Sequence, residues 1–309
     1  MTSRPVRFSR LFQQIAPGKG AMKVVDRRSK SHERQPGNTP GRYLSEGFQP
    51  APKPYWRRPV KGAAALEPTG NTLRFVLDRA TRRRYSDAQI DDYQDLPRRR
   101  FPWSPPLRLT VRARFSHPAS ELAGTAGFGF WNDPFVMTGG RLPWLPRAVW
   151  FFFASPPSNM KLDPGVPGYG WKAATIDALR PAAVPLVLLA LPAVLLMNIP
   201  ALYRALWPPI QRAVNVGEAL VPAEMTDWHT YVLDWGRERA RFFVDPASSP
   251  LEGPFLEAPS PRGPQGLVLW IDNQYLVITP QGRFRWGMLD VPDRQWMEVD
   301  HVTVEATQA

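Results

Sequence analysis

The sequence predicts an all-β protein in which antiparallel strands pack as a two-sheet sandwich, and three observations support this class. Residues 228–235 alternate between two side-chain faces, as a strand does, and a polar turn at residues 236–239 separates them from an aromatic and β-branched run at 241–244. This pattern is typical of a β-hairpin. The 36 proline residues favour many short elements over long helices. A chain of 309 residues with 43% hydrophobic content can bury a sizeable core as one domain.

Other alternating or β-branched runs predict strands along the rest of the chain. The clearest is Leu107–Phe115, where aliphatic and aromatic side chains share one face and three arginines share the other. Such a strand has one face against a core and one face in water. The other strands predicted from the residues lie at 72–77, 124–135, 171–177, 266–278 (a strand pair or one long bent strand) and 284–288. Strands at 85–93, 148–154 and 297–304 are implied by the family resemblance given below.

The composition excludes several classes of site. The chain has no cysteine, so it has no disulfide, no thiolate metal site and no cysteine nucleophile. Its four histidines lie far apart, at positions 32, 117, 229 and 301, which argues against a multi-histidine metal centre. No phosphate-binding glycine loop and no serine nucleophile elbow is found. We therefore expect no cofactor and no metal.

The net charge of +12 is concentrated at the N-terminus. Residues 1–42 contain ten Lys and Arg against two acids, and this composition predicts a basic disordered tail. An amphipathic segment that binds an anionic membrane surface, or a transit-type segment, is the alternative. No nucleic-acid-binding motif accompanies the charge, so no nucleic acid is expected as a partner. No secretory signal is seen, and the expected location is cytoplasmic, with peripheral membrane association as an option.

Three motifs, in this order along the chain, resemble a known family. Residues 124–135, GTAGFGFWNDPF, are similar to a glycine- and tryptophan-containing cleft strand of the family-16 glycoside hydrolases. The W-H-x-Y-x-x-x-W pattern at 228–235, a short turn and F-x-V-D at 242–245 resemble the central hairpin of that family. MEVDHVTV at 297–304 resembles its closing strand. The likeness runs over residues 43–305, leaves 306–309 as a short tail, and implies a concanavalin A-like jelly roll.

The same resemblance argues against the family's usual chemistry. Residues 148–154 stand where the family carries the Glu-x-Asp-x-x-Glu pattern of its catalytic strand. Retaining hydrolysis needs two carboxyl groups about 5–5.5 Å apart. Here no acidic residue lies between Arg147 and Met160, and Trp150 is followed by three phenylalanines. The resemblance therefore implies the fold and a sugar-type cleft without standard glucanase activity.

Three tryptophans and two amides are the candidate ligand-binding residues. Trp131 follows Gly127 and Gly129 in one predicted strand, where small residues beside an aromatic ring can form a stacking floor for a sugar; equally, the glycines can make room for bulky core neighbours. Trp150 and Trp270 are the other candidate rings.

Asn273 and Gln274 follow Asp272 inside an otherwise apolar run. Burying these groups costs free energy unless they are hydrogen-bonded or face water. A wet cleft is favoured, and a buried structural network is the alternative.

Residues 180–220 interrupt the β pattern. Residues 182–202 contain no charge over a length that matches a membrane span, but three prolines would break a continuous helix there. We expect a short helical insertion that dips into one leaflet, covers the cleft as a lid, or meets another subunit. Beyond it, two short amphipathic pieces separated by Pro208 and Pro209 are predicted.

Two functions of different classes follow. The favoured one is a binding module that holds a carbohydrate, a glycolipid or another apolar or amphiphilic small molecule in the cleft near a membrane surface. The alternative is an atypical glycoside hydrolase, or another acid/base enzyme, that uses Asp133 and Asp272. A carboxyl pair within about 10 Å on one face would favour the enzyme.

Overall fold

The structure is a computed structural model that describes residues 43–49, 51–134, 142, 144–183, 195–247 and 253–307. The predicted basic tail at residues 1–42 lies outside the described residues. So do residues 184–194 of the predicted insertion. Residues 39–309 form one compact unit.

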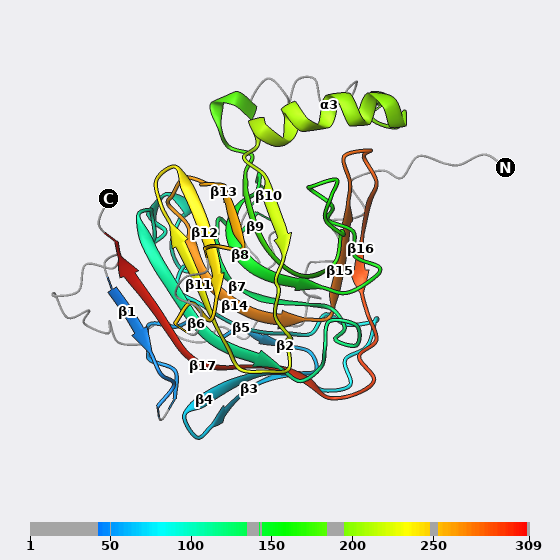
Figure 1. Cartoon of the computed structure of the whole chain (residues 1–309). Coiled ribbons are helices and arrows are strands. Elements are labelled where there is room, and N and C mark those ends of the chain that lie inside the picture. The colour runs from blue at the N-terminus through cyan, green and yellow to red at the C-terminus, as the bar shows by residue number, and fades with distance from the viewer. Residues whose placement is uncertain are drawn as a thin grey trace, which may run out of the picture. The chain divides into compact units, whose positions relative to one another are not determined.

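Two antiparallel sheets make up the domain, as predicted (Figure 1). Sheet A contains, in spatial order, β13 (Leu256–Pro259), β12 (Arg239–Val244), β11 (His229–Trp235), β6 (Leu107–Phe115), β17 (Gln295–Ala306), β4 (Thr72–Leu77) and β3 (Ala64–Thr69). β1 (Tyr43–Glu46) pairs with the C-terminal half of β17. Sheet B contains, in spatial order, β10 (Gly217–Leu220), β9 (Gly170–Asp177), β8 (Arg147–Ala154), β7 (Thr125–Trp131), β14 (Gly266–Asp272), β5 (Asp87–Asp91) and β2 (Val60–Lys61).

The hydrophobic core lies between the two sheets. On β6 the apolar side chains are buried in strict alternation with the arginines, so the predicted one-sided strand is confirmed. Phe128 and Phe130 of β7 and Phe151 of β8 supply the facing layer from sheet B. Tyr231 and Trp235 of β11 are fully buried among these rings. Each buried aromatic ring removes a large apolar area from water, which makes this layer the main contribution to stability.

The predicted hairpin at residues 228–245 is confirmed. β11 pairs with β12 from Tyr231 opposite Val244 to Trp235 opposite Ala240. At its open end the Asp245 carboxylate accepts a hydrogen bond of 2.7 Å from the Thr230 backbone N–H and contacts His229 Nδ1 at 2.5 Å. His229 is therefore held by a structural contact with Asp245.

The run at residues 266–278 forms two separate strands. β14 ends at Asp272 within sheet B, and β15 (Gln274–Ile278) pairs with β16 (Phe284–Met288) in a two-stranded ribbon. Asn273 lies at the break. Its side-chain amide donates to the carbonyl oxygens of Thr81, Arg84 and Leu289, and its Oδ1 accepts from the Ser86 N–H.

The insertion is helical in part. A 3₁₀ turn, η3 (Pro181–Ala183), and the helix α3 (Pro200–Ala213) are found, but Gly217–Leu220 is β10, the edge strand of sheet B. The predicted break at Pro208 and Pro209 is wrong, because α3 continues through both. Proline removes a helical hydrogen bond, yet Trp207 Nε1 donates to Leu162 O and Gln211 Nε2 donates to Asp163 Oδ2, which fixes both sides of the Pro–Pro step. Among the described residues, no helix is both long and apolar enough to cross a membrane.

A second 3₁₀ turn, η2 (Arg98–Arg100), follows β5 and leads into β6. It lies in the segment that covers part of the outer face of sheet B, because Phe101 packs with Tyr93, Trp131 and Val268. This cover decides which part of that face is open to solvent.

Candidate functional site

The three predicted tryptophans come together on the outer face of sheet B. Trp131 lies on β7, Trp150 on β8 and Trp270 on β14, and all three point away from the core that faces sheet A. Ring centroids are 5.8 Å apart for Trp131 and Trp150, 5.6 Å for Trp150 and Trp270, and 6.3 Å for Trp131 and Trp270. We call these three residues the tryptophan face.

The glycines of β7 make this packing possible. Gly129 lies opposite Trp150 and Gly127 lies opposite Trp270. A Cβ on Gly129 would lie 2.6 Å from both Cα and Cβ of Trp150, and one on Gly127 would lie 2.3 Å from Phe151 O. The glycines therefore make room for bulky neighbours, and those neighbours form the aromatic face.

The cover of the tryptophan face is uneven. Trp131 is only 7% exposed, packs against Tyr93 and Phe101, and donates from Nε1 to the Tyr93 hydroxyl. Phe152 of β8 is also buried, beside Met160. Trp150 and Trp270 remain partly exposed. These two rings are thus the part of the face that a ligand can reach, and the buried Trp131 ring packs against both.

A chain of hydrogen bonds holds Trp270 in place. Its Nε1 donates to Thr125 Oγ1 at 2.9 Å, and that hydroxyl donates to Asp272 Oδ1 at 2.8 Å. Asp272 Oδ1 also accepts the Gln274 backbone N–H at 3.0 Å. A satisfied chain of this kind fixes the orientation of the indole ring.

Asp272 has an acidic partner that the sequence did not indicate. It lies directly opposite Asp87 of β5 on the outer face of sheet B, and the Tyr85 hydroxyl bonds to both carboxyl groups. Burial raises the pKa of Asp272 to about 6, and burial together with the Asp272 charge raises the pKa of Asp87 well above its ordinary value. Like charges directly opposite in a sheet repel, so this pair favours a shared proton. Only the pairing of β5 with β14 brings them together.

Asp133 does not join this pair. Asp272 lies opposite Thr125 at one end of β7, whereas Asp133 follows the other end, beyond Trp131. The six residue steps from Thr125 to Trp131 span about 20 Å. Burial raises the pKa of Asp91 to about 6, and the Asp133 charge adds to that increase. The acid/base pair of Asp133 and Asp272 is therefore not formed.

The two predicted amides are buried. Asn273 is fully buried and committed to the four backbone groups described above, so the structural-network alternative holds for it. Gln274 is 7% exposed at the start of β15. Asn273 therefore has no group to offer a ligand, and Gln274 is also buried.

A buried ion pair borders the face on the side of β9 and β10. Lys172 and Glu218 are fully buried with Nζ and Oε2 2.8 Å apart, and the lysine lies 5.2 Å from the Phe152 ring centroid. Glu218 Oε1 also accepts the backbone N–H groups of Leu162 and Asp163. Burial lowers the pKa of Lys172, while the Glu218 charge opposes that change. The pair anchors the loop that carries Met160 over the aromatic side chains.

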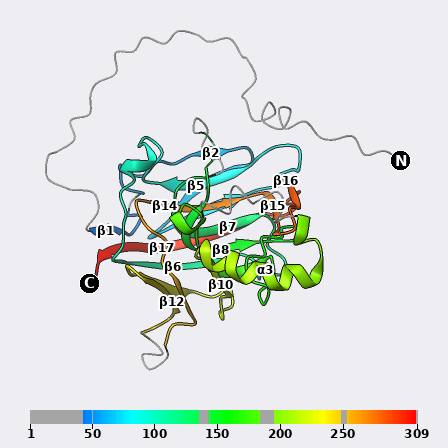
Figure 2. The same ribbon diagram turned by 90° about the horizontal axis from the view of Figure 1, so that it is seen from above.

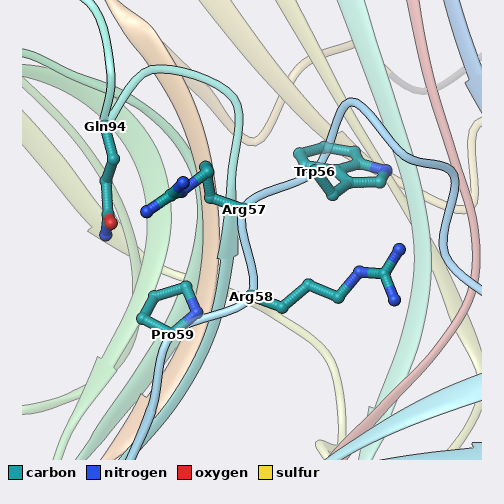
Figure 3. A pocket seen from close by; sticks show the side chains of 5 residues that line it. All are labelled: Trp56, Arg57, Arg58, Pro59 and Gln94. Carbon is teal, nitrogen blue, oxygen red and sulfur yellow. The ribbon is translucent and has the colours of Figure 1, made fainter. Parts of the chain in front are cut away.

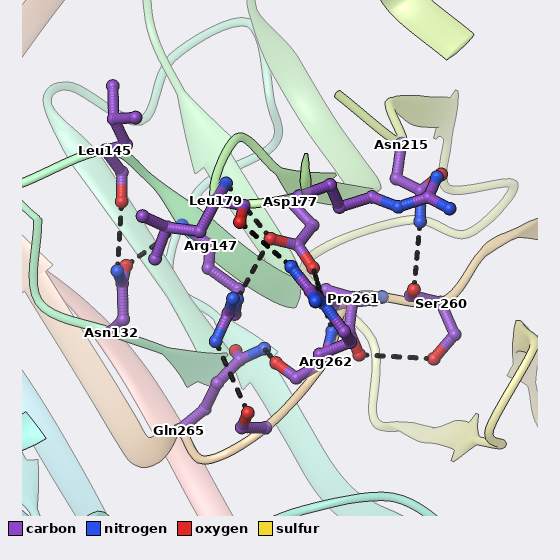
Figure 4. A network of polar contacts seen from close by, with 12 residues as sticks. Asn132, Leu145, Arg147, Asp177, Leu179, Asn215, Ser260, Pro261, Arg262 and Gln265 are labelled. Atoms are coloured by element: carbon purple, nitrogen blue, oxygen red, sulfur yellow. Dashed lines mark hydrogen bonds and ion pairs between the residues drawn. The ribbon is translucent and has the colours of Figure 1, made fainter. Parts of the chain in front are cut away.

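A second polar network closes the opposite ends of β8 and β9 (Figure 4). The fully buried Asp177 accepts hydrogen bonds from Arg147 Nε at 3.0 Å and from the backbone N–H of Arg262 at 3.1 Å. Arg147 N also donates to Asn132 Oδ1. Every polar group of Asp177 has a partner, so this network is structural.

Two hollows are found at the surface of the described residues, away from the tryptophan face. One, of about 310 Å³, is lined by Trp56, Arg57, Arg58, Pro59 and Gln94 (Figure 3). The other, of about 320 Å³, lies between residues 197–203 and the turn of the β15–β16 ribbon. Neither is lined by Trp131, Trp150 or Trp270. No group of three or more metal-ligating side chains occurs in the described part of the chain.

No family model and no curated protein matches the chain. A prokaryotic beta-1,3-1,4-glucanase (lichenase) derived from a mouse hindgut metagenome is similar in structure, with 11% identity and a TM-score of 0.46 over 86% of this chain and 100% of that chain. An immunostimulatory antigen and pseudo beta-1,3-glucanase of Mycobacterium tuberculosis matches with 9% identity and a TM-score of 0.46, over 86% of this chain and 98% of that chain.

A glycosyl hydrolase family 16 protein from Mycobacterium smegmatis matches with 12% identity and a TM-score of 0.45, over 84% of this chain and 98% of that chain. These likenesses concern the fold, which the order of strands in the two sheets already establishes. They assign no activity to this chain. The two-sheet antiparallel sandwich that the sequence predicts is confirmed as the fold class.

Proposed function

We propose that the protein binds a carbohydrate, or the sugar part of a glycolipid, on the tryptophan face. The observation that carries this proposal is the pair of partly exposed rings, Trp150 and Trp270, whose centroids lie 5.6 Å apart on either side of the glycine strand β7. Binding sites for small ligands are mainly aromatic and apolar, with a few polar groups that fix orientation. A pyranose ring offers a flat C–H surface of the size of one indole.

The polar groups beside the rings support this choice of ligand. Thr125 and Asp272 are already engaged with Trp270 and with each other, and Lys172 is paired with Glu218. The ring faces are therefore the groups left for a ligand. This favours a molecule with an apolar face, which includes sugars, glycolipids and other amphiphiles.

The positions of the acids favour binding over hydrolysis. β8 carries no carboxylate, and Asp87 and Asp272 are only 3% and 1% exposed. A carboxyl group that is shielded from solvent cannot reach a glycosidic bond of a ligand that lies on the rings. We therefore propose a binding module without standard glucanase activity.

The test is a titration of the purified protein with soluble β-1,3-glucan, β-1,4-glucan and chitin oligosaccharides, followed by calorimetry. Replacing Trp150 or Trp270 by alanine should weaken binding of the recognised glycan by about 5- to 30-fold, which corresponds to about 1–2 kcal/mol for a central aromatic contact. Trp228→Ala is the matched control, because Trp228 is also partly exposed but packs with Arg112 on sheet A. Equal loss in all three variants would contradict the proposed site.

We also propose that the ligand is met at a membrane surface. Exposed apolar side chains and exposed arginines occur together in the insertion, at Leu195, Ile199 and Arg204 among others. A glycolipid headgroup would satisfy both the sugar-binding face and this surface.

A further inference from the structure

Two segments far apart in sequence form one end of the domain. Residues 195–199 precede α3, and residues 279–283 form the turn of the β15–β16 ribbon. The side-chain amide of Asn198 donates to Gln281 O at 3.1 Å, and Asn198 and Gln281 line the hollow of about 320 Å³ together with Tyr203. Figures 1 and 2 both show α3 and the ribbon at the same end of the sandwich. We call residues 195–212 and 274–288 the docking end.

Large apolar side chains are exposed at the docking end. Leu195, Leu196 and Ile199 are 66%, 45% and 52% exposed, and Phe284 of the ribbon is 57% exposed. The register places Ile278 opposite Phe284 and Leu276 opposite Trp286, so these four share one face of the ribbon. Exposed apolar side chains that gather at one place on a surface mark an interaction site.

The charge of the docking end has one sign. Arg204 and Arg212 of α3 and Arg283 and Arg285 of the ribbon are all exposed, and residues 178–217 and 273–289 contain no Asp or Glu. None of the four arginines has an ion pair among the described residues. On the strands of sheet A, by contrast, the exposed residues Arg108, Arg239 and Arg241 each have an ion pair. The residues of the docking end therefore carry a net charge of +4 beside their exposed apolar side chains.

The exposed apolar side chains and the four arginines together indicate which kind of partner fits the docking end. Exposed aliphatic and aromatic side chains beside four cations that have no ion pair fit the boundary between lipid headgroups and acyl chains. The Asp163 carboxylate, which accepts a hydrogen bond from Gln211, is the acid that lies against α3. Guanidinium groups bind phosphate oxygens in pairs of hydrogen bonds, and anionic lipids supply such oxygens in a plane.

We propose that the docking end binds an anionic membrane surface. Leu195, Leu196, Ile199 and Phe284 enter the interface, and the four arginines contact lipid phosphates. The inference deepens the membrane location proposed above and adds the surface that produces it.

Vesicle flotation of the full-length protein tests the inference. Vesicles of phosphatidylcholine alone, and of phosphatidylcholine with phosphatidylserine, are used without any carbohydrate. Wild-type protein should float with the anionic vesicles and stay behind with the neutral ones. The triple variant Arg204→Gln, Arg283→Gln, Arg285→Gln should bind anionic vesicles at least tenfold more weakly, because each arginine at an anionic surface adds to the affinity.

A matched triple variant controls for total charge and for the basic N-terminal segment. Arg83→Gln, Arg99→Gln and Arg100→Gln removes three exposed cations outside the docking end and should float as the wild type does. A second variant, Phe284→Asp, tests the apolar contact and should also lose binding. The inference is overturned if wild-type protein never floats, if the two triple variants lose binding equally, or if Phe284→Asp instead dissociates a dimer seen by light scattering.

Failure of this inference is distinguishable from failure of the sugar-binding proposal. The variant Trp150→Ala, Trp270→Ala should float like the wild type on vesicles that carry no sugar. The docking-end triple variant should in turn bind soluble glycans as the wild type does.

Discussion

Replacing Asp272 by asparagine should stabilise the protein at neutral pH. The substitution keeps the size of the side chain and leaves Oδ1 in place to accept the hydrogen bonds from Thr125 and from the Gln274 N–H. It removes a carboxyl group that is 1% exposed and lies directly opposite Asp87. Because the two acids repel, the loss of one charge also relieves the other.

The magnitude follows from the pKa of Asp272. Burial raises it from 3.8 to about 6, so the folded protein binds this proton more tightly than the unfolded chain does. Stability from this group is therefore greatest below pH 3.8 and is lost as the pH rises through about 6. The difference corresponds to about 3 kcal/mol of unfolding free energy at pH 7.5. The asparagine variant lacks this penalty and should gain that amount at pH 7.5, and little at pH 4.

Urea unfolding of both proteins at pH 4 and pH 7.5, followed by tryptophan fluorescence, measures the gain. Asp234→Asn is the control, because it removes the partner of Arg108 on the exposed face of sheet A and should bring no gain at either pH. A variant Asp272→Asn that is less stable than the wild type at pH 7.5, or that gains equally at both pH values, would refute the reasoning.

Three further outcomes are expected. Gly129→Ala should lower the unfolding free energy by about 2–5 kcal/mol in thermal unfolding, because it adds backbone strain and a clash with Trp150, whereas Gly70→Ala, also at positive φ but with no atom within 4 Å of its new Cβ, should lose only the strain part; equal losses would contradict the packing account. Lys172→Met should cost about 3–5 kcal/mol in urea unfolding at pH 7.5, since it leaves the Glu218 carboxylate buried and unpaired, and the added change Glu218→Gln should restore part of that loss. Purified protein should release no reducing sugar from β-1,3- or β-1,4-glucan above a heat-inactivated control, and clear turnover would show that a carboxyl pair reaches the substrate.

The positions of many strands along the chain could be predicted from local pattern. The alternation in Leu107–Phe115 and in the hairpin at 228–245 specifies which side chains face the core, because successive residues of a strand point to opposite sides. The same parity places Trp131, Trp150 and Trp270 on outer faces. Strands β3 and β13 were not predicted, since their mixed composition shows neither a clear alternation nor a β-branched run.

Local rules failed where distant contacts oppose them. Pro208 and Pro209 predict a break, but α3 continues because Trp207 and Gln211 are anchored to the loop at Leu162 and Asp163. Asn273 resembles a cleft residue in sequence, yet its amide serves three carbonyl groups from two other segments. The partners that decide both cases are remote in the chain.

The chain of residues therefore determined the strands, their faces and the absence of acids on β8, since these depend on periods of two and on composition. Which strands become neighbours was decided by tertiary structure alone. The pairing of β14 with both β7 and β5 brings Trp270 beside Trp131 and sets Asp272 opposite Asp87 rather than near Asp133. A period of two specifies a face but no neighbour, because register between distant strands depends on how both sheets bury their apolar sides together.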